Sequence, residues 1–240
     1  MPIDQQTTPV TSALDDAYAA WKGWGDPSAH RPGDTQIWDA LHSLVGLKSG
    51  DSLLEIGFGQ GSHLHYCRSK GIAAVGLEQN PKGAAIAQAA GLQVTLGGFD
   101  DLPTTARGFK AILAFDVIEH IPLSELFEMM ARAKERLATD GKILLSFPNG
   151  ASPFGRLHQH GDLTHVNAFN RQSIEQLGVA TGFKLVHYGD HPEFFDNRQL
   201  AQKVKAPLRS LVRAVIKIAV KSYFDEPLGL SVVAVMEPLS

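Results

Sequence analysis

The sequence is poor in cysteine and has no long apolar run. Cys67 is the one cysteine, so an intrachain disulfide cannot form, and a zinc site built on cysteines is excluded. So little cysteine is typical of a reducing compartment and favours a cytoplasmic setting. Because no run of 18 apolar residues occurs, the sequence predicts no membrane-spanning helix.

A large excess of charge of either sign is also lacking. The 22 Lys and Arg residues against 25 Asp and Glu residues give a net charge of -3. Such a chain has no overall attraction for nucleic acid, so no nucleic-acid partner is expected. The polar, acidic first residues are unlike a signal peptide. With 44% hydrophobic residues over 240 positions, the composition is that of a globular chain with room for one large α/β domain.

Strand and helix patterns alternate through most of the chain. Short apolar runs predict strands at 52–58, 73–79, 93–98, 109–116, 142–149, 184–190 and 231–237. Helical spacing of apolar residues predicts helices at 35–47, 63–71, 83–91, 123–141 and 173–183. This alternation is typical of a doubly wound, Rossmann-like α/β fold, in which helices cover both faces of a mostly parallel sheet.

Two segments fall outside the alternation. Residues 1–34 are interpreted as a leader and a cap helix, and residues 35–240 as the main domain. The tryptophans at 21, 24 and 38 predict core or lid packing, with a helix that caps the site as the alternative. A helical insertion at about 196–228 precedes the last strand, and the sheet does not require it.

The insertion contains an amphipathic basic helix at 206–224. Its cations recur at every fourth position, at Lys205, Arg209, Arg213, Lys217 and Lys221. One interpretation is a solvated basic face over an apolar stripe that packs on the domain and covers the substrate pocket. The alternative is a peripheral contact with an anionic membrane surface, or with a partner protein.

The segment between the first strand and the next helix is the most informative. Gly57, Gly59 and Gly61 follow the strand directly. Glycines allow a tight turn and close approach of a ligand, and the helix N-terminus behind them offers free N–H groups. Glu78 ends the second strand, where a carboxylate can accept both hydroxyls of a ribose. An adenosine-containing ligand is therefore expected at the C-terminal edge of the sheet.

This loop departs from two other nucleotide-binding patterns. A dinucleotide fingerprint needs its third glycine at position 62, where this chain has Ser62. A phosphate-binding loop would end in Gly-Lys-Ser or Gly-Lys-Thr, which this loop lacks. Two functions therefore stay open as alternatives for a protein with such a loop. One is a nicotinamide-dependent oxidoreductase, and the other is a non-catalytic cofactor-binding scaffold.

Four segments in order resemble class I S-adenosylmethionine-dependent methyltransferases. They are EIGFGQG (55–61) with Glu78 behind it, FDVIEHIP (115–122), KILLSFPN (142–149) and DLTHVNAFNRQSIEQLGVATGF (162–183). The last segment is similar to the small-molecule branch, which includes ubiquinone-type and sugar or polyketide O-methyltransferases. The resemblance implies a seven-stranded sheet with an antiparallel last strand. It also implies methyl transfer from S-adenosylmethionine to a small-molecule acceptor, with O-methylation favoured.

The resemblance implies cofactor-binding roles for individual residues. Those in and near the first two strands are Glu55, Gly57, Gly59, Gly61, Glu78 and Gln79. Glu55 would orient the loop or meet the amino group of the methionine part. Glu78 would hold the ribose diol, and Gln79 would lie beside the adenine.

Further cofactor contacts are implied after the third and fourth strands. The family often has an acid after the third strand that bonds the adenine amine, and this chain has Gly98 there. Phe99 or Asp100 would serve instead. Asp116, at the end of the fourth strand, would lie beside the sulfonium and the substrate.

Two histidines are the candidates for a catalytic base. His120 follows the fourth strand, and His165 matches the D-x-x-H of the last segment. A neutral imidazole can take a proton from an acceptor hydroxyl near pH 7. The alternative for each is a hydrogen-bonded structural histidine. His158 and His160 lie nearby in sequence, but H-x-H spacing in a loop does not define a tetrahedron, so no metal site is expected.

Overall fold

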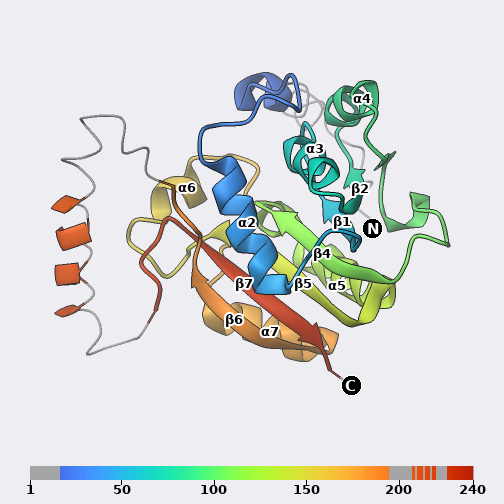
Figure 1. Cartoon of the computed structure of the whole chain (residues 1–240). Coiled ribbons are helices and arrows are strands. Elements are labelled where there is room, and N and C mark those ends of the chain that lie inside the picture. The colour runs from blue at the N-terminus through green and yellow to red at the C-terminus, as the bar shows by residue number, and fades with distance from the viewer. Residues whose placement is uncertain are drawn as a thin grey trace, which may run out of the picture.

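The fold is seen in a computed structural model of the chain (Figure 1). It describes residues 17–194, 207–208, 210–212, 214–216, 218–219 and 226–239. The expected leader and the five cations of the basic helix lie outside the described residues.

Seven strands form one sheet, in the order β3-β2-β1-β4-β5-β7-β6. They are β1 (Ser52–Ile56), β2 (Ala73–Glu78), β3 (Val94–Leu96), β4 (Phe109–Phe115), β5 (Leu137–Pro148), β6 (Phe183–Asp190) and β7 (Ser231–Pro238). The neighbouring pairs β3–β2, β2–β1, β1–β4 and β4–β5 are parallel, while β7 lies antiparallel between β5 and β6. The predicted seven-stranded, mostly parallel sheet with an antiparallel last strand is therefore confirmed.

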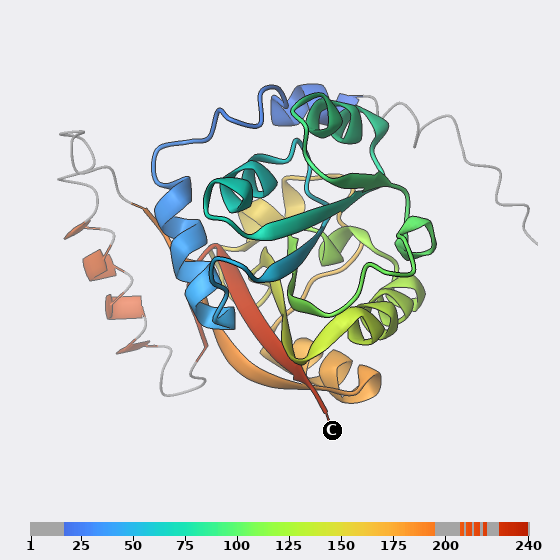
Figure 2. The same cartoon turned by 45° about the vertical axis from the view of Figure 1, so that its right-hand side comes forward.

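Helices cover both faces of this sheet (Figures 1 and 2). On one face lie α2 (Asp34–Val45), α3 (Ser62–Ser69) and α4 (Pro81–Ala89), and on the other α5 (Leu123–Arg136) and α7 (Arg171–Thr181). Each face has its own apolar core, because neighbouring strand residues point to opposite sides. In β4, Ile112 belongs to the α5 side and Leu113 to the α2 side.

Two predictions of secondary structure in the second half of the chain are wrong, one helix end and one loop. The helix expected at 123–141 ends at Arg136, because the backbone of Leu137 is extended (φ -68, ψ 151) and pairs with Phe109 at the start of β5. The side chain of Leu137 still packs on the core, but from a strand. A loop was expected around His158, whereas a short helix, α6 (Arg156–His160), lies there.

The strand order reverses at β1, which has β2 on one side and β4 on the other. The chain leaves β1 for α3 on one face and leaves β4 for α5 on the other face. Open α/β sheets bind their ligands at the carboxyl ends of the strands at such a reversal. The glycine loop after β1 and the segment after β4 both lie at this edge.

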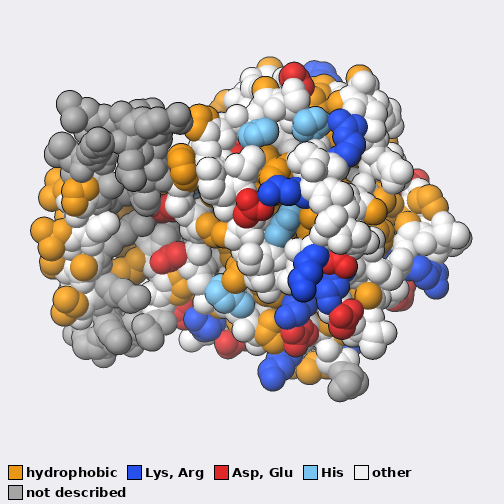
Figure 3. Space-filling view, in the orientation of Figure 1, with side chains coloured by type: hydrophobic (Ala, Val, Ile, Leu, Met, Phe, Trp, Pro, Cys, Tyr) orange, Lys and Arg blue, Asp and Glu red, His pale blue; other side chains and the backbone are white. Residues whose placement is uncertain are grey.

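The segment before β7 is helical at its described residues, 207–208, 210–212, 214–216 and 218–219. Its apolar side chains are exposed rather than packed, namely Leu208, Leu211, Val212, Val215 and Ile218. The described parts of this segment lie away from the sheet, at the left of Figures 1 and 3. The interpretation that this stripe packs on the domain is therefore wrong for these side chains. Within the described ranges, no helix is long and apolar enough to cross a membrane.

Candidate functional site

The glycine loop has a backbone that only glycine adopts readily. Gly57, Gly59 and Gly61 have φ values of 67, 60 and 88, in the left-handed region where a side chain is strained. A Cβ at Gly57 would lie 2.5 Å from Val117 Cγ2, so no larger residue fits there. Gly61 directly precedes α3, whose first N–H groups face this edge of the sheet.

Glu78 connects the end of β2 to this loop. Its Oε2 accepts a hydrogen bond from the Gly59 N–H at 2.8 Å, and its Oε1 accepts one from the Asn80 N–H at 2.9 Å. Burial raises the pKa of the Glu78 carboxyl, and the backbone hydrogen bonds oppose that rise. The carboxylate thus lies beside the loop, as its predicted role requires, while the next residue, Gln79, is exposed.

Phe99 and Asp100 lie in a short 3-10 turn after β3. Phe99 is partly buried and packs against the apolar core on the α5 side. Asp100 is 79% exposed and pairs with Arg132 of α5 at 2.9 Å. Of the two candidates, Phe99 is therefore the better placed to contact a ligand on the sheet edge, and the role of either stays a prediction.

Asp116 has the only left-handed backbone among the non-glycine residues that the structure describes, with φ 52. Such a conformation costs about 1–3 kcal/mol and concentrates at functional sites. It ends β4, while the Asp116 N–H still donates to the Ser146 carbonyl of β5 at 2.8 Å. The turn brings the next residues, up to His120, back across the edge of the sheet.

Hydrogen bonds fix the orientation and tautomer of His120. The Thr164 hydroxyl donates to Asp162 Oδ1 at 2.6 Å, so its oxygen accepts from His120 Nδ1–H at 2.8 Å. The lone pair of a neutral imidazole is then on Nε2. Burial, and next the nearby His165, lower the pKa of His120. His120 is therefore neutral near pH 7 and can accept a proton at Nε2.

His165 lies against His120, with ring centroids 4.6 Å apart. Its Nδ1 is 2.9 Å from the carbonyl oxygen of Gln159. Because a carbonyl can only accept, Nδ1 carries the hydrogen and Nε2 the lone pair. That Nε2 lies 3.9 Å from both Glu119 Oε1 and Asp162 Oδ2. The structure thus brings the two predicted base candidates together, and both rings carry the hydrogen on Nδ1 and the lone pair on Nε2.

Glu119 was not among the predicted site residues, yet it lies at the centre of this group. Its side chain is fully buried, and neither carboxyl oxygen has a hydrogen-bond partner. Burial, and next the Asp116 carboxylate, raise the pKa of Glu119 to about 8. Burying a carboxyl without a hydrogen-bond partner costs free energy of folding, so its presence here indicates a functional role. Donor atoms of Glu119, His120 and His165 are close enough to hold a cation. The Glu-His pair shortly after the fourth strand was the available signal in the sequence.

The N-terminal cap segment, residues 17–25, lies over both halves of the site. Trp24 covers Gly59, where an added Cβ would be 3.1 Å from the indole ring. Tyr18 meets His120 edge to face, with ring centroids 6.3 Å apart. Lys22 Nζ is 3.7 Å from Asp162 Oδ2. The segment therefore contacts the glycine loop and the histidine group together, as in the alternative interpretation of a helix that caps the site.

One predicted cofactor residue, Glu55, and two neighbouring histidines that were not predicted site residues, His158 and His160, have other contacts. The Glu55 carboxylate is buried and lies 2.9 Å from His63 Nδ1 of α3, so its observed contact is with α3. His158 and His160 are exposed on α6, and His158 Nδ1 lies 3.4 Å from the Ser231 hydroxyl. Burial raises the pKa of the Asp116 carboxyl, while His191, Lys22, His158 and His165 lower it, so His158 also lies within electrostatic range of the site.

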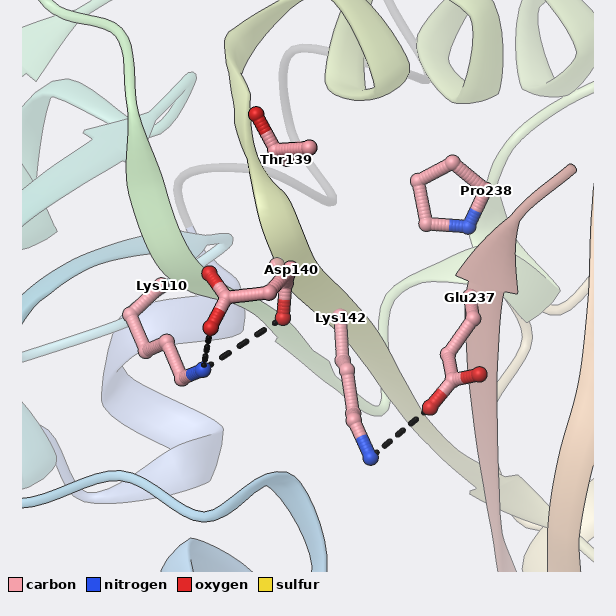
Figure 4. A pocket seen from close by; sticks show the side chains of 7 residues that line it. Lys110, Thr139, Asp140, Lys142, Glu237 and Pro238 are labelled. Carbon is pink, nitrogen blue, oxygen red and sulfur yellow. Dashed lines mark hydrogen bonds and ion pairs between the residues drawn. The ribbon is translucent and has the colours of Figure 1, made fainter. Parts of the chain in front are cut away.

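The pocket in Figure 4 lies at the opposite edge of the sheet. Its lining is Lys110, Thr139, Asp140, Gly141, Lys142, Glu237 and Pro238. Its charged groups pair with one another, Lys110 with Asp140 at 2.6 Å and Lys142 with Glu237 at 2.8 Å. Because these charges are already paired and no predicted site residue is present, this pocket is not the candidate site.

A family model described as a methyltransferase domain matches residues 29–188. The match covers most of the chain, so the chain belongs to this methyltransferase family. The predicted class, a class I S-adenosylmethionine-dependent methyltransferase, is therefore confirmed. No curated protein sequence matches the chain significantly.

Solved structures have the same fold at low sequence identity. A SAM-dependent methyltransferase from Archaeoglobus fulgidus matches with a TM-score of 0.62 at 17% identity, over 85% of this chain and 95% of that chain. The 1,6-didemethyltoxoflavin-N1-methyltransferase of Burkholderia thailandensis, solved with 1,6-didemethyltoxoflavin and S-adenosylhomocysteine, matches with 0.58 at 18% identity, over 96% and 86%. The 4+2 cyclase SpnF matches with 0.62 at 17% identity, over 100% and 98%.

The residues at the C-terminal edge fit the cofactor of this class, S-adenosylmethionine. The glycine backbone leaves no room for side chains but permits close approach of a ligand. Glu78 presents a buried carboxylate beside it. The contacts of each residue with the cofactor stay predictions.

Proposed function

We propose that this methyltransferase acts on a hydroxyl oxygen of a small-molecule acceptor. The observation that carries the proposal is the pair of imidazoles after β4 and in the 162–165 segment. The Nδ1–H groups of His120 and His165 donate hydrogen bonds to the Thr164 hydroxyl and the Gln159 carbonyl. The Nε2 lone pair of each ring is therefore left to take a proton. A hydroxyl is a weak nucleophile until a base removes its proton, whereas a neutral amine needs no base to attack. A site with two bases therefore favours oxygen.

Each part of the site then has a separate task. The glycine loop and Glu78 hold the cofactor, and S-adenosylmethionine supplies a methyl group that its sulfonium already activates. The cap segment, residues 17–25, shields the loop from water, which favours alignment of the reacting groups. His120 or His165 takes the acceptor proton. Glu119, whose pKa is raised to about 8, is mostly protonated near pH 7, so the proton taken by the imidazole leaves to solvent.

Two of the structural neighbours bear on this proposal. The toxoflavin enzyme was solved with a small-molecule acceptor, which supports a small acceptor here, although its name specifies nitrogen. The 4+2 cyclase has the same fold, so a cofactor-binding protein without methyl transfer is the second candidate. A fold by itself does not decide between these activities.

Release of S-adenosylhomocysteine from S-adenosylmethionine, measured with a panel of small phenols, alcohols, carboxylic acids and amines, tests the proposal. We expect turnover with a hydroxyl-bearing acceptor and none with the matched amine. Turnover with amines alone would replace oxygen by nitrogen. Cofactor binding without turnover on any class would favour the second candidate.

S-adenosylhomocysteine is expected to raise the Tm, and NAD is not. A ligand that binds only the native state stabilises it by about 2.7 kcal/mol at about 100 times its Kd. For a chain of this size, each kcal/mol shifts the Tm by about 2–4 °C. Thermal unfolding monitored with each ligand gives the answer. A shift with NAD alone would contradict the cofactor assignment and favour the oxidoreductase alternative.

The exposed apolar helix in 206–224 favours a peripheral contact with an anionic membrane. Aliphatic side chains that face solvent, such as Leu211 and Ile218, can enter the interface, while each nearby cation adds about 1 kcal/mol. We expect co-sedimentation with phosphatidylserine vesicles at low salt, reduced by high salt and by an Arg209→Glu/Arg213→Glu variant. Absence of binding at low salt would refute the contact. A cytoplasmic setting stays a prediction.

A further inference from the structure

A second polar group lies behind the glycine loop, between α2 and the sheet. It consists of His42 of α2 with His63 and Cys67 of α3, which are only 5%, 4% and 0% exposed. One donor atom from each residue lies within 4.8 Å of the others. The other such group in the described part of the chain belongs to the candidate site above.

The distances within this group suit a tetrahedral metal ion. His42 Nε2 lies 2.8 Å from His63 Nε2, and Cys67 Sγ lies 3.5 Å from His63 Nε2 and 3.9 Å from His42 Nε2. A tetrahedral zinc ion, with Zn–N of about 2.0–2.1 Å and Zn–S of about 2.3 Å, requires N–N of about 3.3 Å and N–S of about 3.6 Å. Each observed distance is within about 0.5 Å of these values, so a small rotation of the side chains admits an ion.

Glu55 sets the tautomer that a metal requires. Its Oε2 lies 2.9 Å from His63 Nδ1. Because the carboxylate accepts, His63 carries its hydrogen on Nδ1 and turns the Nε2 lone pair toward His42 and Cys67. A carboxylate on the outer nitrogen of a histidine is the usual support of a metal ligand.

We propose that His42, His63 and Cys67 bind one divalent metal ion of the zinc type, with Glu55 as the outer support of His63. Imidazole and thiolate are the ligands that zinc prefers. The two positive charges of the ion are balanced by the Cys67 thiolate and the Glu55 carboxylate, so the buried group becomes neutral overall. As sulfur donates an electron pair to the ion, the thiol proton leaves to solvent, because metal binding requires the thiolate.

The three protein ligands leave the fourth tetrahedral position to a water molecule, and the ion lies behind the glycine loop rather than at the candidate site. Trp38 and Phe115 lie against the His63 ring, with centroids 5.5 Å and 5.2 Å away. The ion joins α2 to α3, and Glu55 is two residues before Gly57. It would therefore brace the glycine loop from behind. No metal site was predicted, because a single cysteine was held to exclude a zinc site built on cysteines and the His158-x-His160 spacing defines no tetrahedron. The group of His42, His63 and Cys67 forms only when α2 packs on α3, since His42 lies 21 residues before His63.

Cobalt provides a direct test, because Cys67 is the single cysteine of the chain. The full-length protein is stripped with a chelator and titrated with Co²⁺. We expect one equivalent to produce a thiolate-to-cobalt charge-transfer band in the near ultraviolet, and Zn²⁺ to displace it and abolish the band. The group of Glu119, His120 and His165 contains no sulfur, so it cannot produce this band.

Variants distinguish the three ligands from their neighbours. Cys67→Ser should remove the band, and His42→Ala should remove it or weaken Co²⁺ binding severely. Glu55→Gln should lower the affinity by about 10–100-fold. His65→Ala, on the same helix α3 and outside the group, should retain both band and affinity. A wild-type protein without the band, or a His42→Ala protein with the wild-type band and affinity, would show that the histidines simply hydrogen-bond to each other. The wild-type spectrum decides this even where a variant fails to fold.

Discussion

His120→Ala or His165→Ala is expected to lower kcat by about 10²–10⁴-fold, the usual effect of losing a general base. Affinity for the cofactor should change little, because the structure places both rings beyond the glycine loop, against Thr164 and Gln159. Release of S-adenosylhomocysteine at saturating acceptor measures kcat, and calorimetry measures cofactor affinity. His160→Ala, an exposed histidine on α6, is the matched control and should keep full turnover.

The pH profile tests His120 as the base. Burial, and next His165, lower the pKa of His120 from its ordinary value of 6.5. A base works only when deprotonated, so turnover that depends on His120 should fall only below pH 6.5. An acidic limb at or above that value would exclude His120 as the base. Near-full turnover in both alanine variants would mean that alignment alone accelerates the reaction, and neither histidine would be a base.

The sheet could be predicted because its strands are buried on both faces. The run from Ala111 to Phe115 is continuous and apolar, as is typical of parallel strands covered by helices. The position of β7 between β5 and β6 comes from pairing between segments far apart in sequence, which no local pattern encodes, and only the family resemblance suggested it. The end of α5 was missed because Leu137 suits either an apolar helix stripe or a strand, and its pairing with Phe109 decides.

The cofactor half of the site could be read locally, and the acceptor half only in part. Gly57, Gly59 and Glu78 belong to short motifs whose backbone requirements are visible in the residues themselves. The importance of Glu119 follows from complete burial without a partner, which depends on packing. The contact between His120 and Thr164 joins residues 44 positions apart, so the chemistry of the imidazoles emerges only when the loops meet.

Glu78→Ala is expected to weaken binding of S-adenosylhomocysteine by about 1.5–3 kcal/mol, which is about 10- to 150-fold in Kd. The carboxylate holds the Gly59 and Asn80 N–H groups and is the predicted acceptor of the ribose hydroxyls, so alanine removes the anchor of the loop and a ligand contact together. Glu78→Gln keeps one carbonyl acceptor and should lie between alanine and wild type. Glu125→Ala, an exposed acid in the first turn of α5, is the matched control. Calorimetry that finds unchanged affinity in a folded Glu78→Ala protein would place the cofactor elsewhere, away from the acid that the Gly59 N–H bonds.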